Sequence, residues 1–128
     1  MKKIHESAEN YLETILMIGL KQPHVRSIDI ATELDFSKPS VSVAMKNLRL
    51  SGHIEVDSDG FITLTESGRK IAETIYERHQ VLSSCLIRLG VDPQTAAEDA
   101  CRMEHVISPE SFQAIKEHVH NLPHTEED

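Results

Sequence analysis

The strongest constraint on the fold comes from residues 27–64, where two helix patterns joined by a tight turn precede two short alternating segments. The first pattern spans 27–34, with Ser27 as its predicted N-cap and its apolar residues on one face. The second spans 38–51, because Ser37 is a suitable N-cap, Pro39 is tolerated in a first turn, and Gly52 is placed to end the helix.

Alternating residues at 54–56 and 61–64 flank Asp57-Ser58-Asp59-Gly60, which is typical of a β-hairpin. An amphipathic helix over about 7–19 precedes the two helix patterns. Helix, helix, turn, helix and hairpin is the order of a winged helix-turn-helix. We therefore predict a mostly α fold with a small β-hairpin wing, in which a winged helix-turn-helix at 1–70 precedes a helical domain at 71–122. The tail at 123–128 is predicted to be disordered.

The outer face of the 38–51 helix is polar, as expected of a helix that enters the DNA major groove. Serine hydroxyls bind phosphates or base edges, lysines pair with phosphates, and an outward valine suits a thymine methyl group. The alternative is that these are ordinary solvated side chains on a surface helix. The predicted DNA-binding residues are Arg26, Ser37, Lys38, Pro39, Ser40, Ser42, Val43 and Lys46.

The net charge of −8 at first argues against a DNA-binding protein. Residues 1–70, however, carry 9 basic and 10 acidic side chains, whereas residues 71–128 carry 4 basic and 11 acidic ones. The acidity therefore belongs to the second half. The first half, which is the predicted DNA-binding half, has nearly balanced charge and is compatible with binding a polyanion.

The second half contains a cluster of potential metal ligands on a helix predicted to run from Asp92-Pro93 to Ile107. Cys101, Glu104 and His105 are spaced i, i+3 and i+4, so they share one helix face. Thiolate, carboxylate and imidazole together suit a divalent transition metal. The alternative is a surface Glu-His pair beside a half-buried cysteine.

Further ligands can come from the other predicted helices. His79 lies on a long helix that begins near residue 66, and Asn10 and Glu13 share one face of the first helix. A third helix of this half is predicted over about 108–122. Periodicity alone does not bring these helices together.

The sequence resembles the diphtheria-toxin-repressor and manganese-transport-regulator family of metal-dependent bacterial repressors, to about residue 120. This resemblance implies an N-terminal winged helix, a helical dimerisation domain and a metal site between them. It is carried by Glu9-Asn10-Tyr11-Leu12-Glu13-Thr14-Ile15, Ser37-Lys38-Pro39-Ser40-Val41-Ser42, Leu64-Thr65-Glu66-Ser67-Gly68-Arg69, Arg78-His79 and Cys101-Arg102-Met103-Glu104-His105-Val106-Ile107-Ser108.

The resemblance also implies a ligand set. Cys101, Glu104 and His105 match family ligands, and the cysteine is similar to the iron-responsive branch. Glu13 and His79 match ligand positions of the manganese-responsive branch, and Asn10 stands where the two branches have methionine or aspartate. The implied cofactor is a divalent transition metal, Fe(II) or Mn(II). The implied partners are double-stranded operator DNA and a second copy of the chain, in the cytoplasm.

Other classes of protein fit the sequence less well. A metallo-hydrolase needs a substrate pocket, and the chain has no spare loop to form one, so neither catalysis nor a small-molecule substrate is expected. No segment is long enough to span a membrane. The main alternative is a metal-independent winged-helix regulator that senses oxidation, through Cys85 and Cys101, or a small ligand. A pure scaffold would not need the polar face at 37–47.

Overall fold

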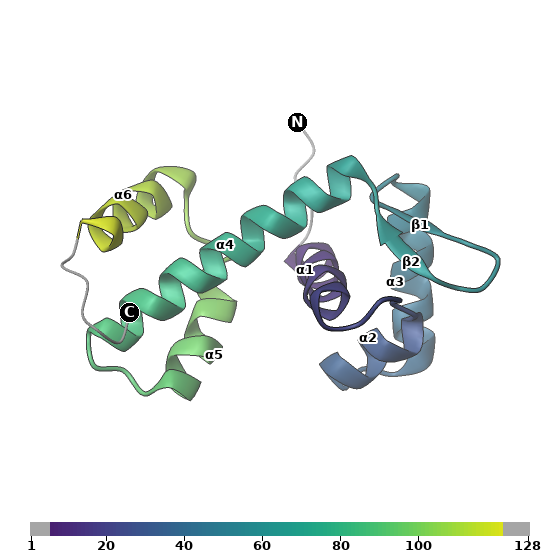
Figure 1. The fold of residues 1–128 in the computed structure, drawn as a ribbon, viewed down its shortest axis with the longest axis horizontal. Coiled ribbons are helices and arrows are strands. Elements are labelled where there is room, and N and C mark those ends of the chain that lie inside the picture. The colour runs from purple at the N-terminus through teal and green to yellow at the C-terminus, as the bar shows by residue number, and fades with distance from the viewer. Residues whose placement is uncertain (1–5, 122–128) are drawn as a thin grey trace. The chain divides into compact units, whose positions relative to one another are not determined.

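The structure, a computed structural model, describes residues 6–121 and is mostly helical with one β-hairpin (Figure 1). The predicted tail at 123–128 lies outside the described residues. The elements are α1 (Glu6–Lys21), α2 (Ser27–Leu34), α3 (Lys38–Leu50), β1 (Ile54–Val56), β2 (Ile62–Leu64), α4 (Glu66–Arg88), α5 (Pro93–Met103) and α6 (Pro109–His120).

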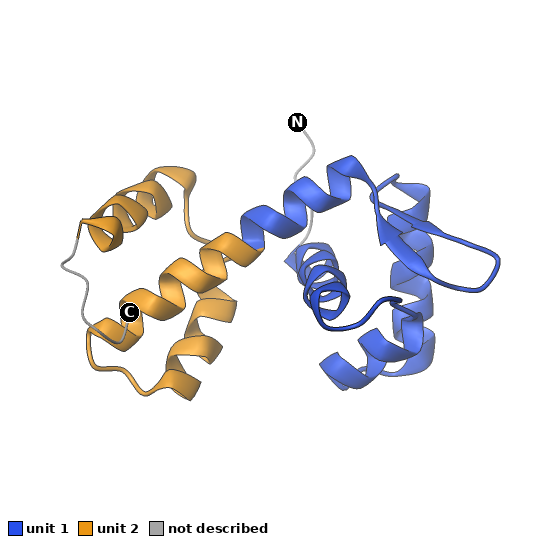
Figure 2. Ribbon diagram, viewed as in Figure 1, with its two compact units in different colours: residues 1–75 blue, residues 76–128 orange. Residues whose placement is uncertain are grey.

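The chain forms two compact units, residues 1–75 and 76–128, coloured separately in Figure 2. The boundary falls inside α4, which is one continuous helix and extends well beyond His79. Among the described residues, no helix combines the length and the apolar character that crossing a bilayer requires.

The first unit has the predicted winged-helix architecture. Its strands pair antiparallel, with Ile54 opposite Leu64. Leu12 of α1, Ile30 of α2, Val41 of α3 and Ile54 of β1 are buried almost completely. Apolar residues from these four elements thus form a common core, and the opposite face of α3 is left in solvent.

The start of α3 follows the sequence prediction, whereas the start of α2 does not. The Ser37 hydroxyl accepts from the Ser40 N–H at 3.3 Å and caps α3. At α2, Ser27 is the first helical residue and Arg26 is the N-cap, so the predicted cap is wrong by one position. The reason is Asp29, whose carboxylate accepts from the Arg26 N–H at 2.8 Å and stabilises that turn.

In the second unit, Asp92 and Ser108 cap α5 and α6 through hydrogen bonds to backbone N–H groups. The prediction that α5 reaches Ile107 is wrong, because the helix ends at Met103. The N–H groups of Val106 and Ile107 both turn back to the Met103 carbonyl, at 3.1 and 3.0 Å, which closes a tight turn. Glu104 and His105 therefore lie in that turn and not inside a helix.

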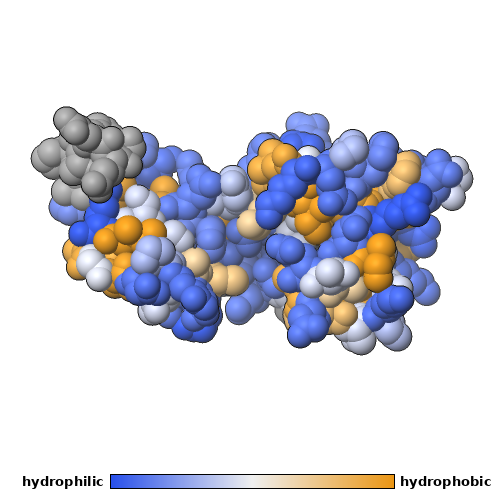
Figure 3. Space-filling view, turned by 60° about the horizontal axis from the view of Figure 1, so that its bottom comes forward, coloured by the Kyte–Doolittle hydropathy of each residue, from blue (hydrophilic) through white to orange (hydrophobic). Residues whose placement is uncertain are grey.

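Several large apolar side chains remain at the surface of each unit. On the face that it draws, Figure 3 shows apolar residues among hydrophilic ones in both units. Val43 and Leu50 of α3 are 60% and 72% exposed. In the second unit, Leu89 and Val106 are 76% and 74% exposed. These side chains gain free energy if a partner covers them.

Candidate metal centre and DNA-binding face

The α5–α6 turn is held against α4 by Arg78. One of its guanidinium nitrogens, Nη1, donates to the carbonyl oxygens of Glu104 at 3.1 Å and Ile107 at 3.2 Å. The guanidinium also lies 5.6 Å from the ring centroid of Phe112 in α6. Arg78 thus satisfies two carbonyls of the turn that follows α5 and holds in place the turn that carries Glu104.

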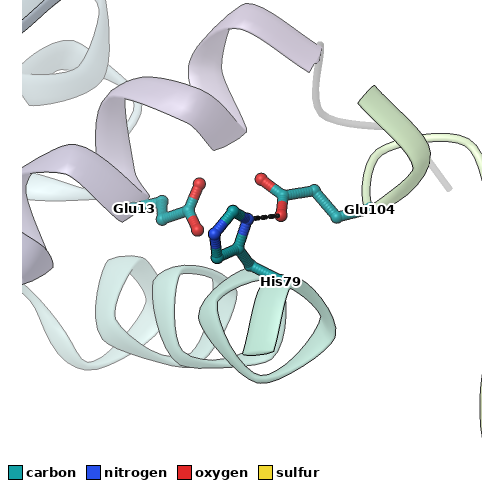
Figure 4. A group of neighbouring side chains, drawn as sticks. All are labelled: Glu13, His79 and Glu104. Atoms are coloured by element: carbon teal, nitrogen blue, oxygen red, sulfur yellow. Dashed lines mark hydrogen bonds and ion pairs between the residues drawn. The ribbon is translucent and has the colours of Figure 1, made fainter. Parts of the chain in front are cut away.

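The Glu104 side chain is completely buried and lies between two histidines. Its Oε2 is 3.0 Å from Nδ1 of His79, the contact drawn as a dashed line in Figure 4. Its Oε1 is 3.4 Å from Nε2 of His105, whose side chain is 3% exposed. His79 is more open, at 24%.

A carboxylate removed from water needs a compensating positive charge. A bound cation would supply this charge. Within the described part of the chain, Glu104 Oε1 is buried without a hydrogen-bond partner, although a carboxylate oxygen normally accepts at least one. One carboxylate and two imidazoles form a donor set that fits a divalent first-row transition metal.

The other predicted ligands have different environments. Cys101 is exposed on α5, so the structure does not bury it with Glu104 and His105. In the first unit, the Glu13 side chain, also labelled in Figure 4, is only 4% exposed. Asn10 is half-buried one turn earlier, and its backbone carbonyl accepts from the Thr14 hydroxyl at 2.8 Å.

Sequence reasoning assigned no role to Arg78, although the residue organises this region. The next residue, His79, was identified as a candidate metal ligand because its side chain is an imidazole. The contacts of Arg78 reach 26 and 29 residues along the chain, to the turn that ends α5. Helical periodicity describes neighbours three and four residues apart and contains no signal for such contacts.

The predicted DNA-binding residues of α3 lie where the sequence places them. Val41, Met45 and Leu48 are buried, while the predicted contact residues from Ser37 to Lys46 are exposed. The Ser37 hydroxyl donates to Ser40 Oγ at 2.8 Å, which leaves the Ser40 proton available to an acceptor. Arg26 is exposed just before α2, and its guanidinium lies 4.7 Å from the ring centroid of Phe61.

The fold and the site together define a winged-helix protein with a transition-metal donor set in its helical unit. Two family models match this chain. The iron dependent repressor N-terminal DNA binding domain matches residues 3–60, and the iron dependent repressor metal binding and dimerisation domain matches residues 65–127. The chain belongs to this family of metal-dependent, DNA-binding transcriptional repressors, which confirms the resemblance seen in the sequence.

Individual relatives agree with this assignment. The transcriptional regulator MntR of Escherichia coli O157:H7 is 35% identical over 87% of this chain and 72% of its own length. The diphtheria toxin repressor of Corynebacterium diphtheriae is 31% identical over 86% of this chain and 49% of its own length.

Among solved structures, a manganese-dependent transcriptional repressor in complex with manganese has a TM-score of 0.81 and 26% identity. The match covers 88% of this chain and 52% of that one. The chain spans about half the length of this structure and of several other solved structures that it matches. The two family models are named for iron and this solved structure for manganese, and the donor set around Glu104 fits a divalent metal of this kind.

Proposed function

We propose that this chain is a cytoplasmic, homodimeric repressor that binds operator DNA when Fe(II) or Mn(II) is bound. The observation that carries the proposal is the Glu104 carboxylate, fully buried between His79 and His105 with one oxygen lacking a hydrogen bond. Such an arrangement is electrostatically unfavourable for an anion alone and becomes favourable with a divalent cation.

The proposed ligand set combines geometry with family resemblance. His79, Glu104 and His105 are supported by their mutual contacts. Cys101, Asn10 and Glu13 are included because their positions match the ligands of the resembled family. Since Asn10 and Glu13 belong to the first unit, binding one ion through ligands of both units would restrict the orientation of the two units.

That restriction explains how a metal can regulate DNA binding. In a two-fold dimer, the orientation of the units sets the separation of the two α3 helices. This separation must match half-sites about 34 Å apart, or a multiple of that distance. Metal then stabilises the DNA-competent state by population shift. The exposed Leu89 and Val106 suit burial by the second copy.

The test is a DNA-binding titration with Mn²⁺, Fe²⁺, Co²⁺ and Zn²⁺, read by fluorescence anisotropy of a duplex selected from a random pool. The substitution Glu104→Gln keeps the shape of the side chain but removes its charge, so metal-dependent DNA binding should be lost. Glu110→Gln is the matched control, because Glu110 is exposed at the start of α6. Circular dichroism checks that both variants fold.

Two outcomes would contradict the proposal. Equal operator affinity with and without metal in the wild-type protein would exclude metal regulation. Loss of DNA binding on adding peroxide, with no effect of a chelator, would favour the redox-sensing alternative. A further variant, Cys101→Glu, tests metal choice: a change of preference towards Mn²⁺ would assign selectivity to position 101.

A further inference from the structure

Arg78 links three elements of the second unit around the candidate metal ligands. It directly precedes His79 in α4. A single guanidinium nitrogen, Nη1, donates to the carbonyl oxygens of Glu104 and Ile107, so one side chain spans the turn that follows α5. Phe112 of α6 is buried, and its ring centroid lies 5.6 Å from the guanidinium carbon. Arg78 therefore connects the helix that carries one candidate ligand to the turn that carries two.

The contacts of Arg78 indicate a geometric role and not the neutralisation of an acid. Among the described residues no carboxylate forms an ion pair with Arg78, and its Nε is buried without a hydrogen-bond partner. The Glu104 carboxylate contacts His79 and His105, while Arg78 binds the main chain of Glu104. By charge alone, a guanidinium next to a cation site opposes binding of the cation. Any benefit of Arg78 to the site must therefore come from the position that it gives to the turn.

A second contact between α4 and α6 provides a comparison. Lys116 Nζ lies 2.9 Å from Glu77 Oε2, and both side chains are partly exposed. Within the described part of the chain, neither of these side chains hydrogen-bonds to the turn after α5. Arg78 and Lys116 are thus both cations between α4 and α6, and they differ in whether they reach the turn.

A fixed ligand spacing matters more for some metals than for others. At an unconstrained site of nitrogen, oxygen and sulfur donors, affinity generally rises from Mn²⁺ and Fe²⁺ towards the later metals, so a preference for the early ones must come from geometry. Mn²⁺ favours an octahedral shell, whereas Zn²⁺ is satisfied by four ligands and has no geometric preference from its d electrons. Loosening the turn should therefore harm Mn²⁺ binding more than Zn²⁺ binding.

We propose that Arg78 is a positioning residue that sets the metal preference of this site. It holds the turn with Glu104 and His105 at a fixed place against α4, where His79 faces Glu104 (Figure 4), so the spacing of these three ligands is set before a metal binds. The inference rests on the proposed metal-dependent function and adds to it the residue that decides among divalent metals.

The first test compares the Mn²⁺ and Zn²⁺ affinities of the full chain without DNA. Free Mn²⁺ is followed by electron paramagnetic resonance, and Zn²⁺ by competition with a colorimetric chelator. Arg78→Gln should weaken Mn²⁺ binding by about 10–100-fold and Zn²⁺ binding by a smaller factor. Arg78→Lys should recover part of the Mn²⁺ affinity, because an ammonium group can donate to a carbonyl but lacks the planar guanidinium. Lys116→Gln is the matched control and should leave both affinities unchanged.

The second test measures amide hydrogen exchange in the metal-free protein. The N–H groups of Val106 and Ile107 bind the Met103 carbonyl, so their exchange reports opening of the turn. Arg78→Gln should accelerate this exchange by about ten-fold, because a charged donor to the turn is lost. Amides in the middle of α4 and α5 should keep their exchange rates.

Substitutions of Phe112 give a second route to the same loosening if Arg78→Gln does not fold. Phe112→Leu removes the aromatic support of Arg78 but leaves the guanidinium and the two carbonyls in the chain. The ratio of Mn²⁺ to Zn²⁺ affinity should then fall by about two- to five-fold. Phe112→Tyr retains the aromatic face and should keep the wild-type ratio. Thermal melting checks that each variant folds.

The outcomes separate this inference from the function on which it rests. Equal losses of Mn²⁺ and Zn²⁺ affinity in Arg78→Gln would show a merely structural role and would overturn the inference, as would tighter binding of either metal. Unchanged exchange at Val106 and Ile107, or equal acceleration in the middle of α4 and α5, would overturn it too. A wild-type protein whose DNA affinity does not respond to metal would contradict the proposed regulation alone, since both tests are made without DNA. A wild-type protein that binds neither metal would overturn both.

Discussion

At the scale of single residues, the most informative side chains are those whose environment does not suit their chemistry. Glu104 is a carboxylate with no exposure, and Val43 is an apolar side chain that is 60% exposed on the predicted DNA-binding face of α3. Each costs free energy in the isolated chain. Each becomes favourable with a partner of the right kind, a cation for Glu104 and an apolar base edge for Val43.

Val43 leads to a prediction about base recognition. The apolar group that the major groove offers is the thymine methyl group. A contact with it contributes about 0.8 kcal/mol, or about four-fold in affinity, per half-site. Replacing one operator thymine by uracil should therefore weaken wild-type binding by about this factor, and Val43→Ser should abolish the difference. Leu50→Ala, at the far end of α3, is the control. Equal sensitivity of Val43→Ser and wild type to uracil would contradict the contact.

At the scale of elements, the junction between α3, the hairpin and α4 depends on a close backbone approach at Gly68. A Cβ built at Gly68 would lie 1.9 Å from the carbonyl oxygen of His53. The Thr65 and Ser67 hydroxyls also donate to the neighbouring Gly52 carbonyl, at 2.7 and 3.2 Å. The start of α4 is thus packed directly on the loop that follows α3.

Gly68→Ala should destabilise the protein by about 3 kcal/mol, because backbone atoms must move apart to accept the methyl group. Gly19→Ala provides the matched control within α1. Its Cβ would lie 4.0 Å from the nearest atom, Cγ2 of Val25, and alanine is favoured over glycine in a helix by about 0.5–1 kcal/mol. Urea unfolding of the two variants should give changes of opposite sign. If both variants were less stable than the wild type, the protein would be sensitive to an added methyl group in general, and the close approach at Gly68 would not be the specific cause.

Elements with local signals were predictable from the sequence, and those fixed by distant contacts were not. The α3 helix has a cap at Ser37 and a proline in its first turn, and the hairpin has alternation around Gly60, so both match the prediction closely. The α5 helix ends at Met103, four residues early, and Arg78, far away in sequence, binds two carbonyls of the turn that follows it. The types of the metal ligands were predictable from the sequence. The burial of Glu104 was not, because it depends on contacts between residues that are far apart in the sequence.

At the scale of the whole molecule, charge is divided between the two units. Residues 1–75 carry 9 basic and 11 acidic side chains, a net charge of −2, whereas residues 76–128 carry 4 basic and 10 acidic ones, a net charge of −6. Bound divalent metal offsets part of the charge of the second unit. The acidity of the chain is therefore compatible with its DNA-binding family. Without metal, the uncompensated negative charge of the second unit repels DNA phosphates, and this repulsion is strongest at low salt.

Coupling between metal and DNA must be reciprocal, since it is an equilibrium property of one molecule. If metal raises operator affinity by a given factor, operator DNA must raise metal affinity by the same factor, and typical couplings are about 5–150-fold. The measurement is a Mn²⁺ titration by calorimetry with and without the selected duplex, compared with the DNA titration at zero and saturating Mn²⁺. A duplex of unrelated sequence should give a smaller factor, because non-specific binding does not require correctly spaced recognition helices.

Unequal factors from the metal titration and the DNA titration would mean that a further equilibrium, such as dimer assembly, contributes to one of them and not to the other. Repeating both titrations over a range of protein concentrations would identify that step, since only assembly depends on the concentration of the chain.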